Sequence, residues 1–357
     1  MSRINVTKAF LPQLEEYEKY LREIWSNDIL TNQGPLLKDF EKATKDYLGI
    51  SNFHFVSNGT IALQIALRAL DISEGEVITT PFSYVASVSS ILWERCEPVF
   101  VDIDPDTFSI DANKIEEAIT PKTKAIMPVH VFGIPCDVEK IEVIARKHNI
   151  KVIYDGAHAF GVEYKGKSLL SYGDISTCSF HATKLFHTIE GGAIITRDIM
   201  VSDKVELLKR FGHTGDEHFT LGINAKASEF QAAMGLCNLK YTRDNIEKRQ
   251  HIFNLYDQLL GNKFQRPTIR ENTKYNYAYY PILFASEQQL LQMINNLNRE
   301  NIFPRRYFYP SLNTLPYLKS TNECVISEDI SKRIMSLPLY AGLKDEDVRR
   351  ICQVINL

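Results

Sequence analysis

The sequence predicts an α/β protein built on a mostly parallel seven-stranded sheet that helices cover on both faces. Between residues 53 and 196, short apolar segments typical of buried strands alternate with longer segments of helical periodicity. The composition, with 44% hydrophobic and 24% charged residues, is that of a soluble globular protein. The length of 357 residues suits a large domain, expected at 1–239, and a smaller C-terminal α/β domain, expected at 240–357.

Two helices are expected before the sheet. Residues 11–28 have an amphipathic helical pattern, and residues 36–48 have a second one. Between them, the Thr-Asn-Gln-Gly-Pro sequence at 31–35 breaks the chain.

The alternating region comes next. Its strands are expected at residues 53–56, 77–80, 98–102, 125–129, 151–155, 175–180 and 193–196. Helices are expected between several of these strands, at residues 61–70, 86–95, 111–119 and 138–148.

The remaining chain also mixes helices and strands. Helices are expected at residues 201–211, from about 228 past 249, at 287–299 and at 345–355. A glycine-marked polar loop is expected at 212–218, and a strand at 277–284. A basic and aromatic segment occupies residues 303–310.

Lys184 is the first candidate for chemistry. It lies just beyond the end of a predicted strand, in the sequence Ser-Phe-His-Ala-Thr-Lys at 179–184. Apolar walls and neighbouring cations would lower the pKa of its amine, which could then attack a carbonyl carbon. A solvated surface lysine is the alternative interpretation.

Asp155 is the second candidate, because it ends the strand predicted at 151–155. Ligands of open α/β sheets bind at the carboxyl ends of strands, so Asp155 and Lys184 are expected to face one crevice. A lysine that forms a Schiff base and a carboxylate for the ring nitrogen are what pyridoxal phosphate (PLP) requires.

The third requirement is a phosphate cradle, and Asn58, Gly59 and Thr60 provide a candidate between a strand and a helix. Gly59 allows close approach of the backbone, Thr60 offers a hydroxyl, and a helix N-terminus favours an anion. An ordinary turn with a helix cap would explain the same residues.

Together these motifs resemble the DegT-type sugar-nucleotide aminotransferases, which are fold-type-I PLP-dependent enzymes. The resemblance covers nearly the whole chain, in order. Its segments are Ser-Asn-Gly-Thr at 57–60, Thr-Pro-Phe-Ser-Tyr at 80–84, Asp-Gly-Ala-His at 155–158, the lysine segment at 179–184, Glu-Gly-Gly-Ala at 190–193 and the segment at 224–233.

The resemblance implies further roles in cofactor binding. Tyr84 is expected to stack on the pyridine ring, and His158 to cover its other face or to hydrogen-bond the ring hydroxyl. Ser179 joins the phosphate donors. Asn224 is expected to reach the phosphate of the neighbouring subunit's cofactor, which implies a homodimer with shared active sites. From spacing alone, a helix cap explains Asn224 equally well.

Substrate-binding candidates are Glu190, which could approach a sugar hydroxyl, and Arg305, Arg306 and Tyr309, which could meet a nucleotide diphosphate and its base. A solvated loop carboxylate and a cationic strand edge are the alternatives. By resemblance, L-glutamate is the amino donor and the Glu-Gly-Gly-Ala form indicates amination at the 4-position.

The expected reaction converts a dTDP-4-keto-6-deoxyhexose into its 4-amino-4,6-dideoxy sugar, for the O-antigen of lipopolysaccharide. Alternatives are a sugar 3-aminotransferase, a related dehydratase and a non-catalytic PLP-binding protein. Dehydratases of this type replace the Schiff-base lysine with histidine, so Lys184 argues against them.

Other properties narrow the class of protein. A net charge of −3 gives no reason to expect nucleic acid or an anionic membrane as partner. No apolar run approaches a membrane span, and the first residues lack a signal-peptide core. The six cysteines have no metal-ligand spacing, which is typical of reduced thiols in a cytoplasmic protein without a metal site.

Overall fold

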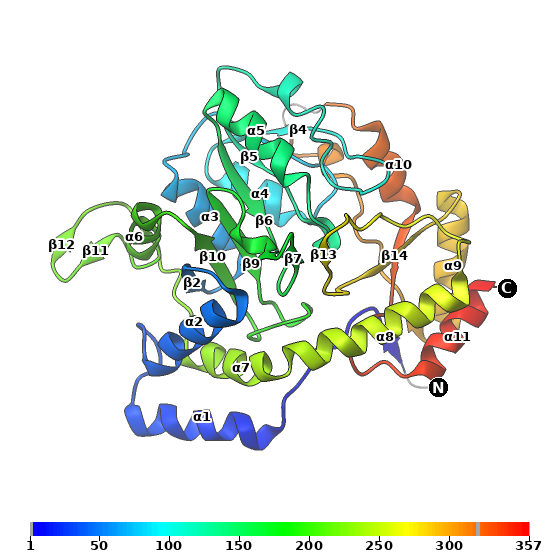
Figure 1. Ribbon diagram of the computed structural model, residues 1–357, viewed down its shortest axis with the longest axis horizontal. Helices are drawn as coiled ribbons and strands as arrows, with labels where there is room; N and C mark the ends of the chain where they lie inside the picture. Colours follow the sequence, from blue (N-terminus) through cyan, green and yellow to red (C-terminus); the bar gives the residue numbers. More distant parts are fainter. Residues whose placement is uncertain (1–2, 319–321, 357) are drawn as a thin grey trace.

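The computed structural model describes residues 3–318 and 322–356 of the chain (Figure 1). Within these residues, seven strands form the central sheet in the order β2-β10-β9-β6-β5-β3-β4. Neighbouring strands are parallel except at β10, which is antiparallel to β9 and β2. The mostly parallel seven-stranded sheet is therefore confirmed. Its strands are β2 Asn52–Val56, β3 Glu76–Thr79, β4 Glu97–Phe100, β5 Thr123–Met127, β6 Lys151–Asp155, β9 Ile175–Ser179 and β10 Gly192–Thr196.

Helices cover both faces of this sheet because successive strand residues point to opposite sides. On β6, Val152 and Tyr154 join one hydrophobic cluster and Ile153 joins another. The first cluster lies under α2, α5 and α7, and the second under α3, α4 and α6. The bounds are α2 Pro35–Leu48, α3 Gly59–Ala69, α4 Ala86–Trp93, α5 Val138–His148, α6 Ile199–Leu208 and α7 Glu229–Lys240.

The carboxyl ends of the parallel strands meet at one edge of the sheet. There β6 ends at Asp155 and β9 ends at Ser179. Because β10 runs in the opposite direction, it begins at this edge, where Gly192 pairs with both Ser179 and Val56. The carboxyl ends of β2, β6 and β9, and the residues that follow them, are thus brought together.

The C-terminal part has its own hydrophobic cluster, formed by α8, α9, α11 and the strand pair β14–β16. In Figure 1 the long helix α8 leads from below the sheet to this part. The bounds are α8 Thr242–Leu260, β14 Tyr280–Leu283, α9 Glu287–Arg299, α10 Val325–Arg333, β16 Ile334–Leu337 and α11 Asp345–Asn356.

The start of the chain packs with this C-terminal cluster. Strand β1, Ile4–Asn5, pairs in parallel with β15, Ile302–Phe303, and Ile4 is 1% exposed. The next helix, α1 (Leu14–Asn27), instead lies against α7. The boundary between the two expected domains, at residues 239 and 240, stays a prediction. Residues 1–2, 319–321 and 357 of these domains lie outside the described residues.

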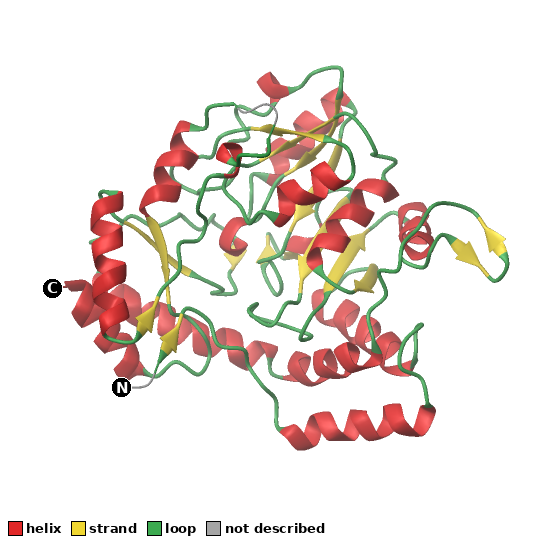
Figure 2. Ribbon diagram, turned by 180° about the vertical axis from the view of Figure 1, so that it is seen from behind, coloured by secondary structure: helices red, strands yellow, loops and turns green. Residues whose placement is uncertain are grey.

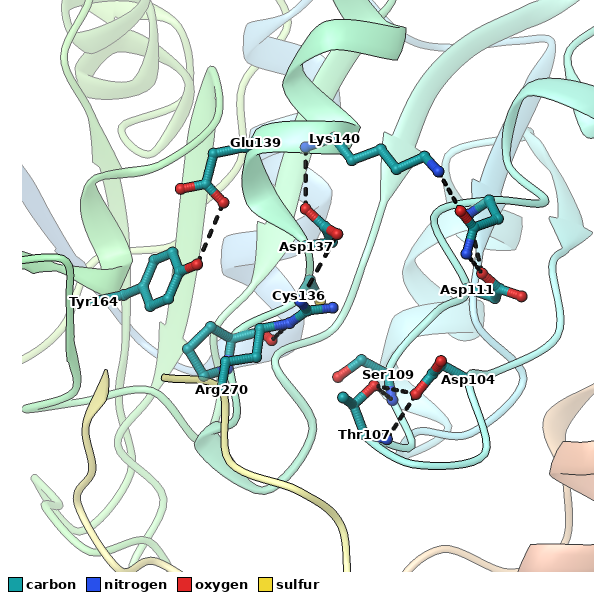
Figure 3. Close-up of polar contacts among 12 residues, drawn as sticks. Asp104, Thr107, Ser109, Asp111, Cys136, Asp137, Glu139, Lys140, Tyr164 and Arg270 are labelled. Atoms are coloured by element: carbon teal, nitrogen blue, oxygen red, sulfur yellow. Dashed lines mark hydrogen bonds and ion pairs between the residues drawn. The ribbon is translucent and has the colours of Figure 1, made fainter. Parts of the chain in front are cut away.

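Two expected helices differ in the structure. The segment at 111–119 contains only a short 3₁₀ helix, Glu116–Ala118. Its first residues form a turn, because the Asp111 carboxylate accepts the backbone N–H of Asn113 and so competes with helical pairing (Figure 3). The helix expected from 228 past 249 is two helices, since α7 ends and α8 begins around Tyr241.

Polar contacts fasten the C-terminal part to the segment before α5. Arg270 donates to the Pro135 carbonyl at 3.0 Å and lies 3.7 Å from the Asp137 carboxylate (Figure 3). Asp137 in turn caps α5 by accepting the N–H of Lys140 at 3.1 Å. Small strands complete the fold: β7 Glu163–Tyr164, β8 Lys167–Ser168, β13 Thr273–Lys274, β11 His213–Thr214 and β12 Glu217–His218. None of the helices described is long and apolar enough to cross a membrane.

Candidate active site

A cleft of about 660 Å³ opens at the carboxyl edge of the sheet. Most of the predicted site residues line it: Asn58, Gly59, Thr60, Tyr84, Asp155, His158, Ser179, Lys184, Glu190 and Arg305. Among the described residues that form its walls, Asn224, Arg306 and Tyr309 do not occur.

Lys184 lies on a closed loop, residues 180–191, that connects β9 to β10; we call it the lysine loop. The N–H of Phe180 donates to the Gly191 carbonyl at 2.8 Å, and the N–H of Thr188 donates back to Phe180 at 2.9 Å. These bonds close the loop at its base, and Lys184 itself is half-buried in the cleft. Burial lowers the pKa of its amine, whereas the negative charge of Asp155 acts in the opposite direction.

Asp155 is 5% exposed and has one donor on each carboxylate oxygen. Its Oδ1 accepts the N–H of Ala157 at 3.1 Å, and its Oδ2 accepts the hydroxyl of Ser87 at 2.8 Å. Burial raises the pKa of this carboxyl group, while the two hydrogen bonds and the cation of Lys184 limit the rise. An anion buried in this way favours a cationic partner in the cleft.

The Asn58–Gly59–Thr60 turn begins α3. The Asn58 side chain caps the helix by accepting the N–H of Ile61 at 2.9 Å. A Cβ at Gly59 would lie 3.0 Å from that of Ser179, so glycine permits this close packing. The first N–H groups of a helix have no partner within it, and here they face a cleft that the Ser179 side chain also borders.

His158 is held by contacts from several elements. Its Nδ1 accepts the backbone N–H of Phe132 at 3.2 Å, so in the neutral ring the hydrogen is on Nε2. The imidazole stacks on Phe308 at 5.6 Å and meets Tyr279 edge-on at 4.9 Å. Burial lowers the pKa of His158 well below its ordinary value, so it is a neutral hydrogen-bond donor at the cleft.

Tyr84 contrasts with His158 because its side chain is 56% exposed. It lies on the turn before α4, beside the cleft. An aromatic ring that is free at one wall of a cleft is available to stack on a planar ligand.

Glu190 lies near the far end of the lysine loop, with its carboxylate 3.4 Å from Nε2 of His181. Its backbone carbonyl accepts hydrogen bonds from Thr188 and Gln231, so the loop fixes the backbone while the side chain stays exposed. Both Glu190 and His181 border the cleft.

The neighbouring residues Arg305 and Arg306 point in different directions in the structure. Arg305 lines the cleft, with its guanidinium carbon 5.1 Å from the ring centre of Tyr307. Arg306 instead donates to Glu287 at 2.7 Å and to the Lys332 carbonyl at 2.9 Å, and it covers the Tyr309 ring at 3.5 Å. Arg306 and Tyr309 therefore form a contact outside the cleft.

Asn224 is exposed and forms an isolated β-bridge with Arg210, away from the cleft of its own chain. The next residue, Ala225, accepts the N–H of Ser57 at 2.9 Å. The segment that carries Asn224 is thus fastened beside the strand that leads to Asn58.

Sequence reasoning did not identify several residues that form the cleft. Tyr279, Tyr307 and Phe308 come from the C-terminal part, and the buried Ser87, outside the lining itself, contacts Asp155. The aromatic run at 307–309 was a usable signal for Tyr307 and Phe308. Ser87 had none, because a serine in the first turn of a helix is common.

Residues 13–356 match the model of the DegT/DnrJ/EryC1/StrS aminotransferase family. The chain belongs to this family. The chain is 42% identical, over 363 residues, to a dTDP-4-amino-4,6-dideoxy-D-glucose transaminase of Shigella dysenteriae, and the match covers 99% of this chain and 98% of the relative.

Solved structures agree with the family assignment. DesI, determined in the presence of its TDP-sugar product, has a TM-score of 0.94 and 28% identity over 99% of this chain and 92% of its own. Spr1654 from Streptococcus pneumoniae, in its PLP form, has a TM-score of 0.90 and 26% identity over 99% and 97% of the two chains.

The protein is therefore a PLP-dependent sugar aminotransferase of fold type I. The cleft fits this cofactor on its own geometry. It combines a half-buried amine, a buried carboxylate and a helix N-terminus whose glycine allows a close approach.

Proposed function

We propose that this aminotransferase transfers the amino group of L-glutamate to the 4-position of a dTDP-4-keto-6-deoxyhexose. The product is the corresponding 4-amino-4,6-dideoxy sugar. The observation that carries the proposal is the convergence of Lys184, Asp155 and the Asn58–Thr60 turn on one cleft. The similarity to a dTDP-4-amino-4,6-dideoxy-D-glucose transaminase supports the choice of sugar.

The bound cofactor would supply a ring that accepts the electrons left on the donor carbon. We assign to Lys184 the attachment of the cofactor and the movement of a proton at the reacting carbon. Its lowered pKa suits this task, because a larger fraction of the amine is then free to accept a proton. Asp155 would hold a proton at the ring nitrogen through its buried negative charge.

The remaining cleft residues would orient the ligand. The Asn58–Thr60 turn and Ser179 would bind the phosphate, and Tyr84 would stack on the ring. His158 would offer its Nε2–H as a donor to the ring hydroxyl, since Nδ1 already accepts the N–H of Phe132. This favours the hydrogen-bonding role of His158 over a purely stacking one.

For the sugar nucleotide, Arg305 is the cation available to the diphosphate, because Arg306 is occupied by Glu287. The exposed Glu190 carboxylate, which borders the cleft, would accept a hydrogen bond from a sugar hydroxyl. Thus Arg305 would bind the diphosphate of the substrate, and Glu190 would bind its sugar.

A panel of nucleotide-linked keto-sugars, each incubated with L-glutamate and the holoenzyme, tests the proposal. Mass detection should show the amino sugar and 2-oxoglutarate in equal amounts with the dTDP-4-keto substrate. Amination of 3-keto sugars instead would indicate a 3-aminotransferase. Loss of water without amination would indicate a dehydratase, and no turnover with any sugar would support the non-catalytic alternative.

We further infer a homodimer whose two active sites share residues. In support, the β11–β12 hairpin projects from the body of the chain (Figure 2). Apolar side chains at its base are exposed, with Phe219 at 59% and Leu221 at 84%. Water-exposed apolar surface of this kind is typical of an interface. Asn224 follows the hairpin and would reach the partner's phosphate.

Mixed dimers test this arrangement. Asn224→Ala and Lys184→Ala chains are each expected to be weak, but in a mixed dimer one site carries both changes and the other carries neither. Part of the wild-type activity should therefore return on mixing. No recovery in confirmed heterodimers would assign Asn224 to its own chain, and a fully active monomer in sedimentation would refute the shared site.

We also infer a cytoplasmic enzyme that supplies an amino sugar for O-antigen or a similar cell-surface polysaccharide. A nucleotide-linked product suits this role, because such sugars are activated donors. A strain without this gene should lose the 4-amino sugar from its surface polysaccharide, and unchanged polysaccharide composition would contradict the inference.

A further inference from the structure

Behind Asp155 lie two serines that no binding role explains. Ser87, in the first turn of α4, is 0% exposed, and its Oγ is 2.8 Å from Oδ2 of Asp155. The same Oγ is 2.9 Å from that of Ser83, which lies at the cleft one residue before Tyr84. The three polar groups form a continuous chain from the cleft wall to the carboxylate.

The direction of the hydrogen bonds follows from the chemistry of the groups. An ionised carboxylate can only accept, so the single hydrogen of the Ser87 hydroxyl points to Asp155. Ser83 must then donate its own hydrogen to Ser87. Each donor polarises the next, so the two serines together favour negative charge on Asp155 more than Ser87 would alone.

We propose that Ser87 is the positioning residue of Asp155, and that Ser83 supports it as the second donor of a directed chain. The inference deepens the proposed function, since it rests on Asp155 serving the cofactor ring. Ser87 and the N–H of Ala157 hold the two carboxylate oxygens from fixed directions. The carboxylate is thereby kept both oriented and ionised in a site where burial favours its neutral form.

A structural role for Ser87 would predict a different contact. Buried helical serines commonly bond to a carbonyl of the preceding turn. Ser90, on the same helix and also 0% exposed, does this by donating to the Ser87 carbonyl at 2.8 Å. Ser90 is thus a matched control: the same change, Ser→Ala, removes one buried hydroxyl from α4 without touching Asp155.

The experiment compares Ser87→Ala with Ser90→Ala in the holoenzyme. A hydrogen bond to a charged group suggests a roughly 10- to 100-fold loss in kcat and in PLP affinity for Ser87→Ala. Asp155 must be ionised, so activity falls as pH drops through its pKa. Loss of a donor raises that pKa, and the acid limb of the kcat profile should move to higher pH.

The other titratable groups around Asp155 stay unchanged in these variants. They are Lys184 on the lysine loop, Cys178 on β9 and His158 after β6. A shift of the acid limb in Ser87→Ala but not in Ser90→Ala therefore reports the lost hydroxyl. The absorbance of the bound cofactor, titrated with pH, should show the same shift.

Two further variants complete the design. Ser87→Thr keeps a hydroxyl and should restore the acid limb. Ser83→Ala should shift it in the same direction by a smaller amount, and it provides the test if Ser87→Ala does not fold. Equal profiles for Ser87→Ala, Ser83→Ala and Ser90→Ala would overturn the inference.

Asp155→Asn separates this failure from failure of the proposed function. If Asp155→Asn is crippled while Ser87→Ala matches Ser90→Ala, only the serine chain is wrong. If Asp155→Asn keeps wild-type rates, the assignment of Asp155 itself is wrong.

Discussion

The two walls of the cleft differ in how firmly backbone hydrogen bonds fix the positions of their side chains. On the sheet wall, Asp155 and Ser179 end paired strands, and the lysine loop is closed at its base by backbone hydrogen bonds. On the opposite wall, the backbone of residues 305–308 pairs through an isolated bridge between Arg305 and Ser336, and side-chain contacts hold the rest of this described segment. The pairing at Arg305 is strand-like, so Arg305 and Tyr307 face the cleft while Arg306 faces away.

The difference shows that a strand end positions a residue more predictably than an unpaired segment does. All the site residues predicted at the carboxyl edge of the sheet line the cleft, whereas Asn224, which follows the β11–β12 hairpin, does not. Of the three predicted residues on the opposite wall, only Arg305 does. We therefore expect the sheet wall to serve the cofactor and the chemistry, and the opposite wall to bind the diphosphate of the sugar nucleotide.

The largest effect should come from Lys184, at the centre of the sheet wall. Lys184→Ala should lower kcat by at least about 10²–10⁴-fold, the usual contribution of a positioned acid–base group. Borohydride treatment of the wild-type holoenzyme should fix the cofactor to the peptide that contains Lys184. Labelling of a different lysine would contradict the assignment.

Asp155→Asn should give the next largest effect. The amide keeps nearly the same shape but has no negative charge for the ring nitrogen. Removal of one preorganised charge partner costs about 3–4 kcal/mol of barrier. Turnover should fall accordingly, while thermal unfolding of the variant stays near that of the wild type. A near-normal kcat would show that Asp155 is not the ring partner.

Substitution on the opposite wall should change the KM for the sugar nucleotide more than kcat. Arg305→Ala should raise KM for the sugar nucleotide by roughly 10- to 100-fold, because a charged hydrogen bond to the diphosphate is lost. Its KM for glutamate should change little. The matched control is Arg306→Ala, which removes the adjacent arginine and its contact with Glu287. If both substitutions raise the KM for the sugar nucleotide equally, the assignment of the diphosphate to Arg305 rather than Arg306 is wrong.

The smallest expected effect is a decrease in the free energy of unfolding at lower pH, caused by histidines on the sheet side of the molecule. His130, His158 and His187 are buried, and burial lowers the pKa of each, that of His130 to about 3. As the pH falls from 7 to 6, histidines of the unfolded chain take up protons more readily than these folded imidazoles do. The free energy of unfolding should therefore fall by about 1–2 kcal/mol between pH 7 and pH 6.

Denaturant unfolding at the two pH values measures this change. Imidazole NMR signals check its cause, since the rings of His130 and His158 should keep neutral shifts at pH 5.5. Asp155 and Glu229, whose pKa values burial raises, act in the opposite direction. A protonated His158 at pH 5.5 would contradict its role as a neutral donor.

Sequence reasoning located the sheet well because its signals are local. The predicted strand 151–155 coincides with β6, and the predicted helix 138–148 coincides with α5. The helix expected at 111–119 failed for a local reason as well, since Asp111 bonds its own turn. The pairing of Ile4 with Ile302 could not be predicted, because no periodicity relates residues so far apart.

The sequence by itself determined the sheet, the family resemblance, the position of Asp155 at a strand end and that of Lys184 just beyond one. These follow from period-two apolar patterns and turn residues, which act within a few positions. Only the tertiary structure decided that Arg305 rather than Arg306 borders the cleft, and that Ser87 contacts Asp155. Such facts depend on the directions of side chains from distant segments, and packing, not local propensity, sets those directions.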